Sequence, residues 1–260
     1  MSEKYERLEV AKDGGALTIT LAYPERRNAI GPLMTNELLY ALEAARADAE
    51  VRVVVLTGKG KAFCAGGDFA QMSGGADAPA RPHKGDYADL LRELWRFDKP
   101  VIARVNGHAM GGGLGLVAAS TFAIASDDAL LGTPEIDVGL FPMMIMAVLS
   151  RLMPRRRLVE MMLLGQKLTA EEARAAGIVG RVVPLADLDA AVAELVTALV
   201  AKSPITTRIG LRAIADAEEL ELDRALPLLR DRLGECLATD DAREGLMAFL
   251  EKRPPKWTGR

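Results

Sequence analysis

Cysteine and histidine are scarce in this chain of 260 residues, which contains two of each. The two cysteines, Cys64 and Cys236, are too few for a disulfide framework or for a zinc site built from four thiolates. The two histidines, His83 and His108, have no metal-ligand spacing to each other or to the cysteines. We therefore expect no metal centre.

The chain also lacks an excess of positive charge and a long apolar run. Its 33 basic and 36 acidic residues give a net charge of −3, which argues against a nucleic-acid partner. The longest weakly polar stretch, residues 138–150, is interrupted by Pro142 and is shorter than the roughly 20 residues that a membrane helix needs. Because the N-terminus is charged and has no apolar core, it is not typical of a secretory signal. We expect a cytoplasmic protein with no membrane partner.

The first half of the chain alternates predicted strands with predicted helices. Half of all residues are hydrophobic and 27% are charged, so the chain can bury a sizeable core. Strands are predicted at 17–21, 51–57, 101–105 and 121–125, and helices at 35–47 and 89–97, followed by a short helix that ends at Ala119. This alternation predicts an α/β fold.

The second half is predicted to be mainly helical. Thr169 and Glu172 form a capping box that opens a short helix, and a brief strand is predicted at 178–183. Residues 185–251 are typical of three or four amphipathic helices, broken near Ser203–Pro204 and at Pro227. Residues 72–86 are predicted to form a loop. Since no linker separates the halves, we expect one domain, with a core over 1–200 and a helical extension over 201–260.

Two glycine-rich segments, Phe63–Asp68 and Asn106–Gly115, each follow a predicted strand. Glycine permits a positive φ and lets a ligand approach the main chain closely. The second segment opens a helix, whose first N–H groups lack partners and favour negative charge. Such a place can bind a phosphate or a developing oxyanion. Tight packing of a helix on a sheet needs the same glycines, so the glycines alone leave both readings open.

Six segments of the chain carry motifs in a fixed order. They are Arg27–Ile30, Phe63–Asp68, Asn106–Gly113, Thr133–Gly139, the run within 168–184 and Phe249–Arg253. Together they resemble the crotonase superfamily of enoyl-CoA hydratases and isomerases over nearly the whole chain. The resemblance implies a spiral of ββα units with a C-terminal helical region that builds homotrimers or dimers of trimers. It also implies an acyl-CoA thioester substrate and no further cofactor, since coenzyme A is part of that substrate.

The resemblance assigns roles to three residues. A fourth residue that it would imply is absent from this chain. The resemblance implies that the backbone N–H groups of Gly67 and Gly112 form an oxyanion hole for the thioester oxygen, which gains charge when an enolate forms. Glu135 matches the glutamate that moves the Cα proton in this family, and its apolar neighbours would raise its pKa. Family hydratases carry another glutamate at the position that is Gly115 here. Its own sequence context alone would favour a helix-start or surface carboxylate for Glu135 beside Pro134, and only the resemblance favours catalysis.

A single glutamate suits a 1,3-proton shift, because one base can take a proton from C2 or C4 and return it at the other carbon. Hydration stays open if Glu135 also holds the water. A non-catalytic acyl-CoA-binding protein is an alternative, which Gly115 favours. A sister reaction on the same oxyanion hole, such as decarboxylation or thioester hydrolysis, is another.

Coenzyme A is expected to meet the main chain near Ala65 and the basic side chain of Arg26 or Arg27. Phe249 and Lys252 match family positions on the last helix that close the CoA site, often from a neighbouring subunit. For each of these side chains, an ordinary surface role fits the sequence equally well.

Other reactive or apolar side chains receive weaker predictions. Cys64 has no flanking base, so we interpret it as a buried thiol rather than a nucleophile. His108 is expected to pack or to support the site. Met143, Met144 and Met146, together with Phe141, are predicted either to line the acyl or subunit surface or to belong to the core.

Overall fold

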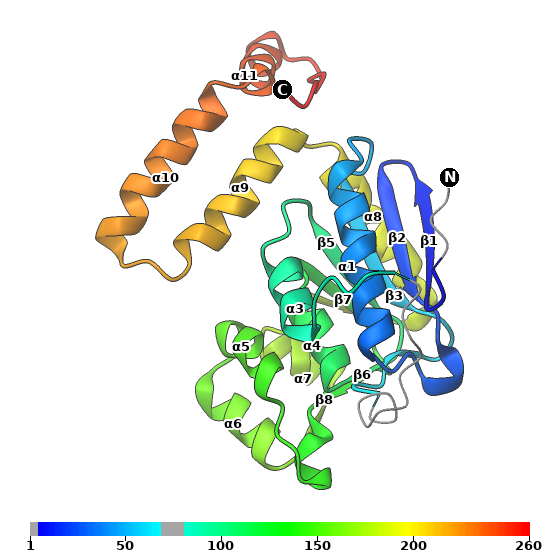
Figure 1. The fold of residues 1–260 in the computed structure, drawn as a ribbon. Helices are drawn as coiled ribbons and strands as arrows, with labels where there is room; N and C mark the ends of the chain where they lie inside the picture. Colours follow the sequence, from blue (N-terminus) through cyan, green and yellow to red (C-terminus); the bar gives the residue numbers. More distant parts are fainter. Residues whose placement is uncertain (1–4, 69–80) are drawn as a thin grey trace.

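The computed structural model describes residues 5–68 and 81–260, and its strands form two sheets (Figure 1). The larger sheet has the order β1 (Leu8–Asp13), β2 (Ala16–Leu21), β3 (Val53–Gly58), β5 (Val101–Val105), β7 (Phe122–Ser126) and β10 (Arg181–Val183). The smaller sheet has the order β4 (Ala62–Cys64), β6 (His108–Met110), β8 (Leu130–Gly132) and β9 (Lys167–Thr169). From β2 onward the larger sheet is parallel, and β1 joins its edge as an antiparallel strand.

The fold repeats a unit of two strands and a helix, and each unit contributes one strand to each sheet. One unit consists of β5, β6 and α4 (Gly112–Ala119), and the next consists of β7, β8 and α5 (Met143–Leu152), with the 3-10 helix η2 (Pro134–Val138) before α5. In both units the first strand joins the larger sheet and the second joins the smaller one. This arrangement confirms the predicted α/β class and its ββα repeat.

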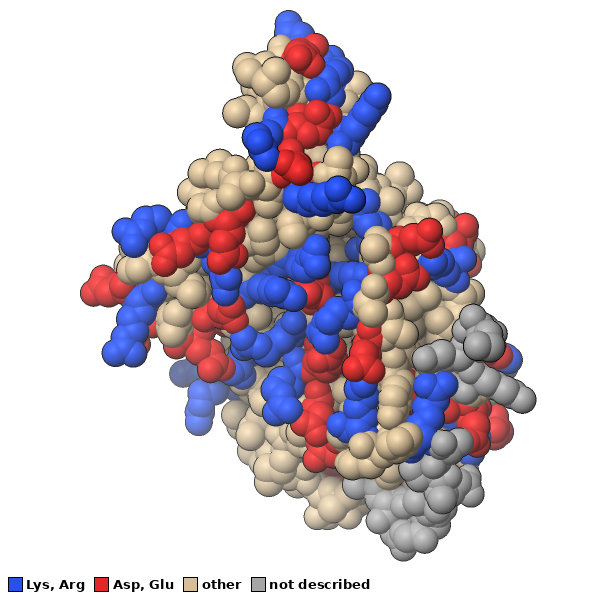
Figure 2. Space-filling view, turned by 45° about the horizontal axis from the view of Figure 1, so that its top comes forward, with Lys and Arg blue, Asp and Glu red and all other residues tan. Residues whose placement is uncertain are grey.

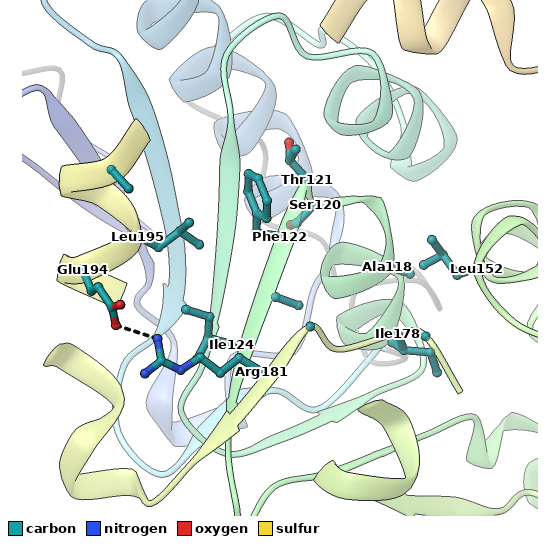
Figure 3. Close-up of a pocket in the computed structure, with 14 residues that line it drawn as sticks. Ala118, Ser120, Thr121, Phe122, Ile124, Leu152, Ile178, Arg181, Glu194 and Leu195 are labelled. Atoms are coloured by element: carbon teal, nitrogen blue, oxygen red, sulfur yellow. Dashed lines mark hydrogen bonds and ion pairs between the residues drawn. The ribbon is translucent and has the colours of Figure 1, made fainter. Parts of the chain in front are cut away.

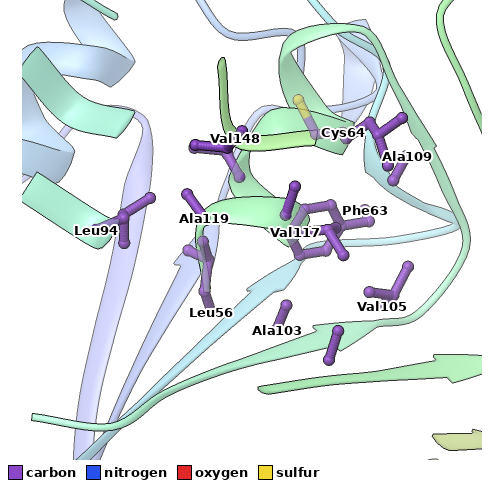
Figure 4. Packing of buried hydrophobic residues seen from close by; sticks show 14 of the residues in the cluster. Leu56, Phe63, Cys64, Leu94, Ala103, Val105, Ala109, Val117, Ala119 and Val148 are labelled. Carbon is purple, nitrogen blue, oxygen red and sulfur yellow. The ribbon is translucent and has the colours of Figure 1, made fainter. Parts of the chain in front are cut away.

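Helices cover both faces of the larger sheet. α1 (Pro32–Ala47), α7 (Ala170–Ala175) and α8 (Leu188–Val200) contact its strands, whereas α3 (Tyr87–Trp95) packs against other helices and α6 (Arg155–Leu163) packs against α5 and η2. All six residues of β3 are buried, and its side chains alternate between two cores. Val54 and Leu56 face the larger core, part of which Figure 4 shows around Leu56 and Phe63. Val53 and Val55 pack with Leu188 of α8 on the other face. Burial on both faces is typical of parallel sheets.

Three C-terminal helices, α9 (Pro204–Ala217), α10 (Leu222–Leu237) and α11 (Asp240–Glu251), extend away from the two sheets (Figure 1). Ion pairs join them to the core: Arg212 of α9 binds the buried Asp98 carboxylate at 2.6 Å, and Arg96 binds Asp216. Figure 2 shows Lys and Arg side chains interleaved with Asp and Glu below these helices. None of the described helices is both long enough and apolar enough to cross a membrane.

The predicted helix break at Ser203–Pro204 is confirmed, and the predicted break at Pro227 is wrong. Pro227 lies inside α10, at its sixth residue. A proline there removes the N–H that would bond to the Asp223 carbonyl. Because residue 223 is exposed, water can satisfy that carbonyl, so the helix continues.

Most of the predicted loop at 72–86 lies outside the described residues. Its described end leads into α3, which begins at Tyr87, two residues earlier than predicted. Asp86 caps this helix by accepting hydrogen bonds from the N–H groups of Ala88 and Asp89, and the Asp89 side chain accepts from the Asp86 N–H. The capping box fixes where α3 starts, and therefore fixes Tyr87 on its first turn.

Candidate active site

Three predicted site segments follow the carboxyl ends of neighbouring strands. β4, β6 and β8 are parallel, with Ala62 opposite His108 and Ala109 opposite Leu131. The chain therefore leaves all three strands at the same edge of the smaller sheet, which is where parallel sheets place ligand sites. Residues 65–67, 111–112 and 133–135 meet at that edge.

The two glycine segments are in direct contact. A Cβ on Gly113 would overlap the Cys64 carbonyl oxygen and lie 2.7 Å from the Cys64 Cβ. A Cβ on Gly66 would lie 3.1 Å from the Met110 carbonyl, and Gly66 has a φ of 102°. Glycine is needed at both places, because a side chain would separate α4 from β4. The two glycine segments are therefore tightly packed against each other, and their backbone is not covered by side chains of their own.

The local backbone hydrogen bonds leave the N–H groups of Gly67 and Gly112 unpaired. Residues 30 and 67 form an isolated parallel bridge, in which the Ile30 N–H donates to Gly66 and the Asp68 N–H donates to Ile30. This pattern leaves the Gly67 N–H outside the bridge. Gly112 is the first residue of α4, so its N–H has no partner within the helix. Over residues 5–68 and 81–260, neither N–H makes a hydrogen bond.

Asn28 holds the first glycine segment in place. Its backbone has a positive φ of 57°, and its side chain is fully buried. The side-chain N–H groups donate to the carbonyls of Lys59, Ala62 and Phe63 at 2.9–3.2 Å, and the side-chain oxygen accepts from the Tyr23 N–H at 3.0 Å. A buried amide with every group paired rigidifies its surroundings. In the sequence, Asn28 belongs to a motif, but no role could be predicted for it.

Glu135 lies on η2, and its carboxyl group points at the start of α4. Its Oε1 lies 2.5 Å from the position that a Cβ on Gly111 would occupy, and Gly111 has a φ of 48°. Its Oε2 is buried and has no hydrogen-bond partner in the described part of the chain. Burial raises the pKa of the Glu135 carboxyl group above its ordinary value. A desolvated carboxyl group with one unpaired oxygen can exchange protons with a bound ligand.

Tyr87, which was not predicted from the sequence, reaches the same helix turn from α3. Its hydroxyl group donates a hydrogen bond to the Gly112 carbonyl. A Cβ on Gly115 would overlap this hydroxyl group and would lie 2.5 Å from a methyl group of Ile145. The position without a glutamate is thus filled by neighbouring side chains.

The predicted CoA-binding residues fall into two groups. The Ala65 N–H donates to the Arg27 carbonyl at 2.9 Å, so the segment with the exposed Arg26 lies beside the exposed Ala65 at the site. Phe249 is 79% exposed and lies on α11, which Figure 1 shows at the opposite end of the molecule from β6 and β8. Lys252 caps the same helix. A single chain therefore does not bring Phe249 and Lys252 to the site.

The weaker predictions are partly confirmed. Cys64 is fully buried, and burial raises the pKa of its thiol to about 12, so it is the expected inert thiol. His108 supports the smaller sheet by accepting a hydrogen bond from the Leu130 N–H at 3.1 Å. The core alternative for Met143, Met144 and Met146 is wrong, because these side chains are 63%, 47% and 38% exposed.

A cavity of about 440 Å³ lies elsewhere, between β7, β10 and α8. Figure 3 shows Phe122, Ile124 and Leu195 along it, with the ion pair between Arg181 and Glu194 at one side. Glu135, Gly67 and Gly112 are absent from its lining, so this cavity is separate from the candidate site. Over the described residues, no three His, Cys, Asp or Glu side chains cluster in a way that could hold a metal ion.

Comparison with known proteins gives consistent results across the chain. Residues 11–260 match the family model for enoyl-CoA hydratase/isomerase. The chain is 35% identical to the carnitinyl-CoA dehydratase of Escherichia coli K12, covering 98% of this chain and 99% of that protein. It is 32% identical to the short-chain-enoyl-CoA hydratase of Clostridium acetobutylicum, covering 93% and 94%. Its structure resembles the enoyl-CoA hydratase of Mycobacterium smegmatis with a TM-score of 0.90, at 34% identity over 96% of this chain and 98% of that one.

Proposed function

This chain belongs to the enoyl-CoA hydratase/isomerase family, and on that premise we propose that it processes an acyl-CoA thioester through an enolate. The reaction that the site favours is movement of a double bond within an enoyl-CoA. Among the described residues, the site offers the Glu135 carboxylate beside the unpaired Gly112 amide, and a side chain at position 115 would have to displace the Tyr87 hydroxyl group and an Ile145 methyl group.

In this mechanism the thioester oxygen accepts hydrogen bonds from the N–H groups of Gly67 and Gly112. The Glu135 carboxylate removes a proton from C2 or C4, and the electron pair of the broken C–H bond moves into a dienolate whose charge rests on the thioester oxygen. The Glu135 carboxylic acid then returns the proton at the other carbon. Because two fixed donors need no reorganisation, they stabilise the charge as it forms.

One observation carries the proposal: the buried Glu135 Oε2 has no partner in the described structure, and it lies against the helix turn whose first amide is also unpaired. An unpaired buried carboxylate oxygen is costly, and a bound ligand would supply the missing partner here. The proton acceptor and the oxyanion donor thus face a common space.

Coenzyme A is proposed to bind along Ala65 and Arg26, and no other cofactor is needed. Phe249 and Lys252 are proposed to act from a neighbouring subunit of a homotrimer or a dimer of trimers. The distance of α11 from the site and the exposure of Phe249 support this assignment.

Hydration of an enoyl-CoA is the second candidate. It is favoured by the relatives, since the similar proteins include a short-chain-enoyl-CoA hydratase and a carnitinyl-CoA dehydratase. In that case Glu135 would both hold the water and deliver its proton to C2.

Parallel assays with a 3-enoyl-CoA and with crotonyl-CoA test these reactions. We expect conversion of the 3-enoyl-CoA to be the faster reaction, and Glu135→Gln to lower it by roughly 10²–10⁴-fold. Asp137→Asn is the matched control, because Asp137 is an exposed carboxylate on the same 3-10 helix. Faster turnover of crotonyl-CoA would favour hydration. Binding of acyl-CoA without turnover of either compound would contradict both reactions and favour a binding protein or a sister reaction.

A further inference from the structure

In the described structure, one polar side chain from outside the three site segments forms a hydrogen bond with a proposed oxyanion-hole residue. This side chain is Tyr87. It lies on the first turn of α3, which packs against α4. Its hydroxyl group donates to the Gly112 carbonyl, and its ring lies 3.5 Å from the position of a Cβ on Gly112. The bond therefore ends on the residue whose N–H is proposed to face the thioester.

Gly112 has no side chain to restrict its backbone, so its orientation depends on the hydrogen bonds of α4 and of Tyr87. Four of the five residues from 111 to 115 are glycine, and glycine has the largest backbone freedom. Gly111 is fixed from one side, since its N–H donates to the Gly132 carbonyl at 2.8 Å and its carbonyl accepts from the Gly115 N–H at 3.1 Å. The Tyr87 hydroxyl group fixes Gly112 from the other side. The Gly112 N–H lies between the bonded carbonyls of Gly111 and Gly112, so it cannot turn without breaking one of these hydrogen bonds.

We propose that Tyr87 is a positioning residue of the oxyanion hole, which orients the Gly112 amide and occupies the space of any side chain at position 115. This proposal rests on the proposed function. It explains why Gly115 is present: a carboxylate at position 115 and the Tyr87 hydroxyl group would require the same space.

Tyr87 is suited to this role because it stays neutral. Burial, followed by the nearby Cys64 and Glu135 side chains, raises its pKa well above the ordinary value. The phenol therefore keeps its proton for the Gly112 carbonyl and adds no negative charge beside the developing oxyanion.

The test measures carbonyl polarisation directly. An arylacryloyl-CoA absorbs at longer wavelength when hydrogen bonds polarise its thioester carbonyl, so the shift on binding reports the oxyanion hole. Tyr87→Phe keeps the ring and removes the hydroxyl group. We expect the wavelength shift to fall by about half or more and kcat for the 3-enoyl-CoA to fall roughly 10- to 100-fold, with KM changed less than about threefold. That loss is smaller than the roughly 10²–10³ seen when a donor is removed outright.

Tyr40→Phe is the matched control, because the Tyr40 hydroxyl group also donates to a backbone carbonyl, that of Pro82 at 3.3 Å. It should leave both the wavelength shift and kcat unchanged. A purely structural role for Tyr87 would lower the melting temperature and leave the shift per bound ligand intact, which would overturn the proposal. Should Tyr87→Phe not fold, 3-fluorotyrosine placed at position 87 replaces it. This stronger donor of similar size must keep or increase the shift, and a decrease would overturn the proposal.

The two levels of inference fail differently. If the native enzyme shows no wavelength shift and Glu135→Gln keeps full activity, the proposed function is wrong. If the native enzyme shows the shift and Tyr87→Phe shows it equally, only the role of Tyr87 is wrong.

Discussion

Substituting Gly113 by alanine should damage the site through packing alone. The new Cβ would lie 2.7 Å from the Cys64 Cβ and overlap the Cys64 carbonyl oxygen, whereas an ordinary contact begins at 3.4 Å. Both clashing groups belong to the backbone or sit directly on it, so no side-chain rotation relieves them. The start of α4 must move away from β4, by a distance on the order of 1 Å.

The displacement has two expected costs. Overpacking typically lowers stability by about 1–3 kcal/mol, partly offset by the ~1 kcal/mol that alanine gains over glycine inside a helix. The melting temperature should therefore fall by a few degrees. The Gly112 amide moves with α4 and the Gly67 amide does not. Since a misplacement of about 1 Å can cost roughly 10²-fold in rate, kcat for the 3-enoyl-CoA should fall by about that factor.

Gly210→Ala in α9 is the matched control, because a Cβ there meets no atom within 4 Å. It should leave kcat unchanged and raise stability by up to ~1 kcal/mol. Thermal melting and steady-state kinetics of the two variants decide the matter. A Gly113→Ala enzyme with native kcat and melting temperature would refute the claim that contact between the glycine turns sets the site.

Three further predictions concern titratable groups. Burial raises the pKa of Glu135, so kcat/KM should fall as the pH drops through a value above the ordinary 4.5; an acid limb at or below 4.5 would argue against Glu135 as the base. Asp241 is buried, but hydrogen bonds from Ser203, Thr258 and Gly259 outweigh burial and lower its pKa, so Asp241→Asn should cost about 1–3 kcal/mol in urea melts at pH 7. Because this stability exists above the unfolded pKa of about 3.9 and is lost as the pH falls through the lower folded value, the difference between variant and native protein should shrink below pH ~4. Alkylation at pH 8 followed by peptide mass spectrometry should label the partly exposed Cys236 and spare Cys64, whose thiol pKa is about 12; equal labelling would contradict its burial.

The long strands of the larger sheet could be predicted, and the short strands of the smaller sheet could not. β3 and β5 are runs of apolar residues that pack on both faces, which makes them visible in a single sequence. β4, β6, β8 and β9 have three residues each, too few to show an alternating pattern. β1 escaped prediction because only Leu8 among its residues is buried.

Some residues of the candidate site could likewise be predicted from the sequence, and others could not. The glycine segments and the Glu135 segment carry local motifs, so their residues could be named from the sequence. Tyr87 and Asn28 act through hydrogen bonds to residues 25 and 31–35 positions away, and only the folded chain brings those partners together. Phe249 and Lys252 show the converse. A motif identifies them in the sequence, but their own chain holds them far from the site.

The most direct test is a crystal structure with a non-reactive saturated acyl-CoA bound. The thioester oxygen should lie about 2.7–3.1 Å from the backbone nitrogens of both Gly67 and Gly112, with the Glu135 carboxyl group next to C2. A thioester oxygen bonded to neither amide, or an acyl chain that leaves Glu135 uncovered, would contradict the account.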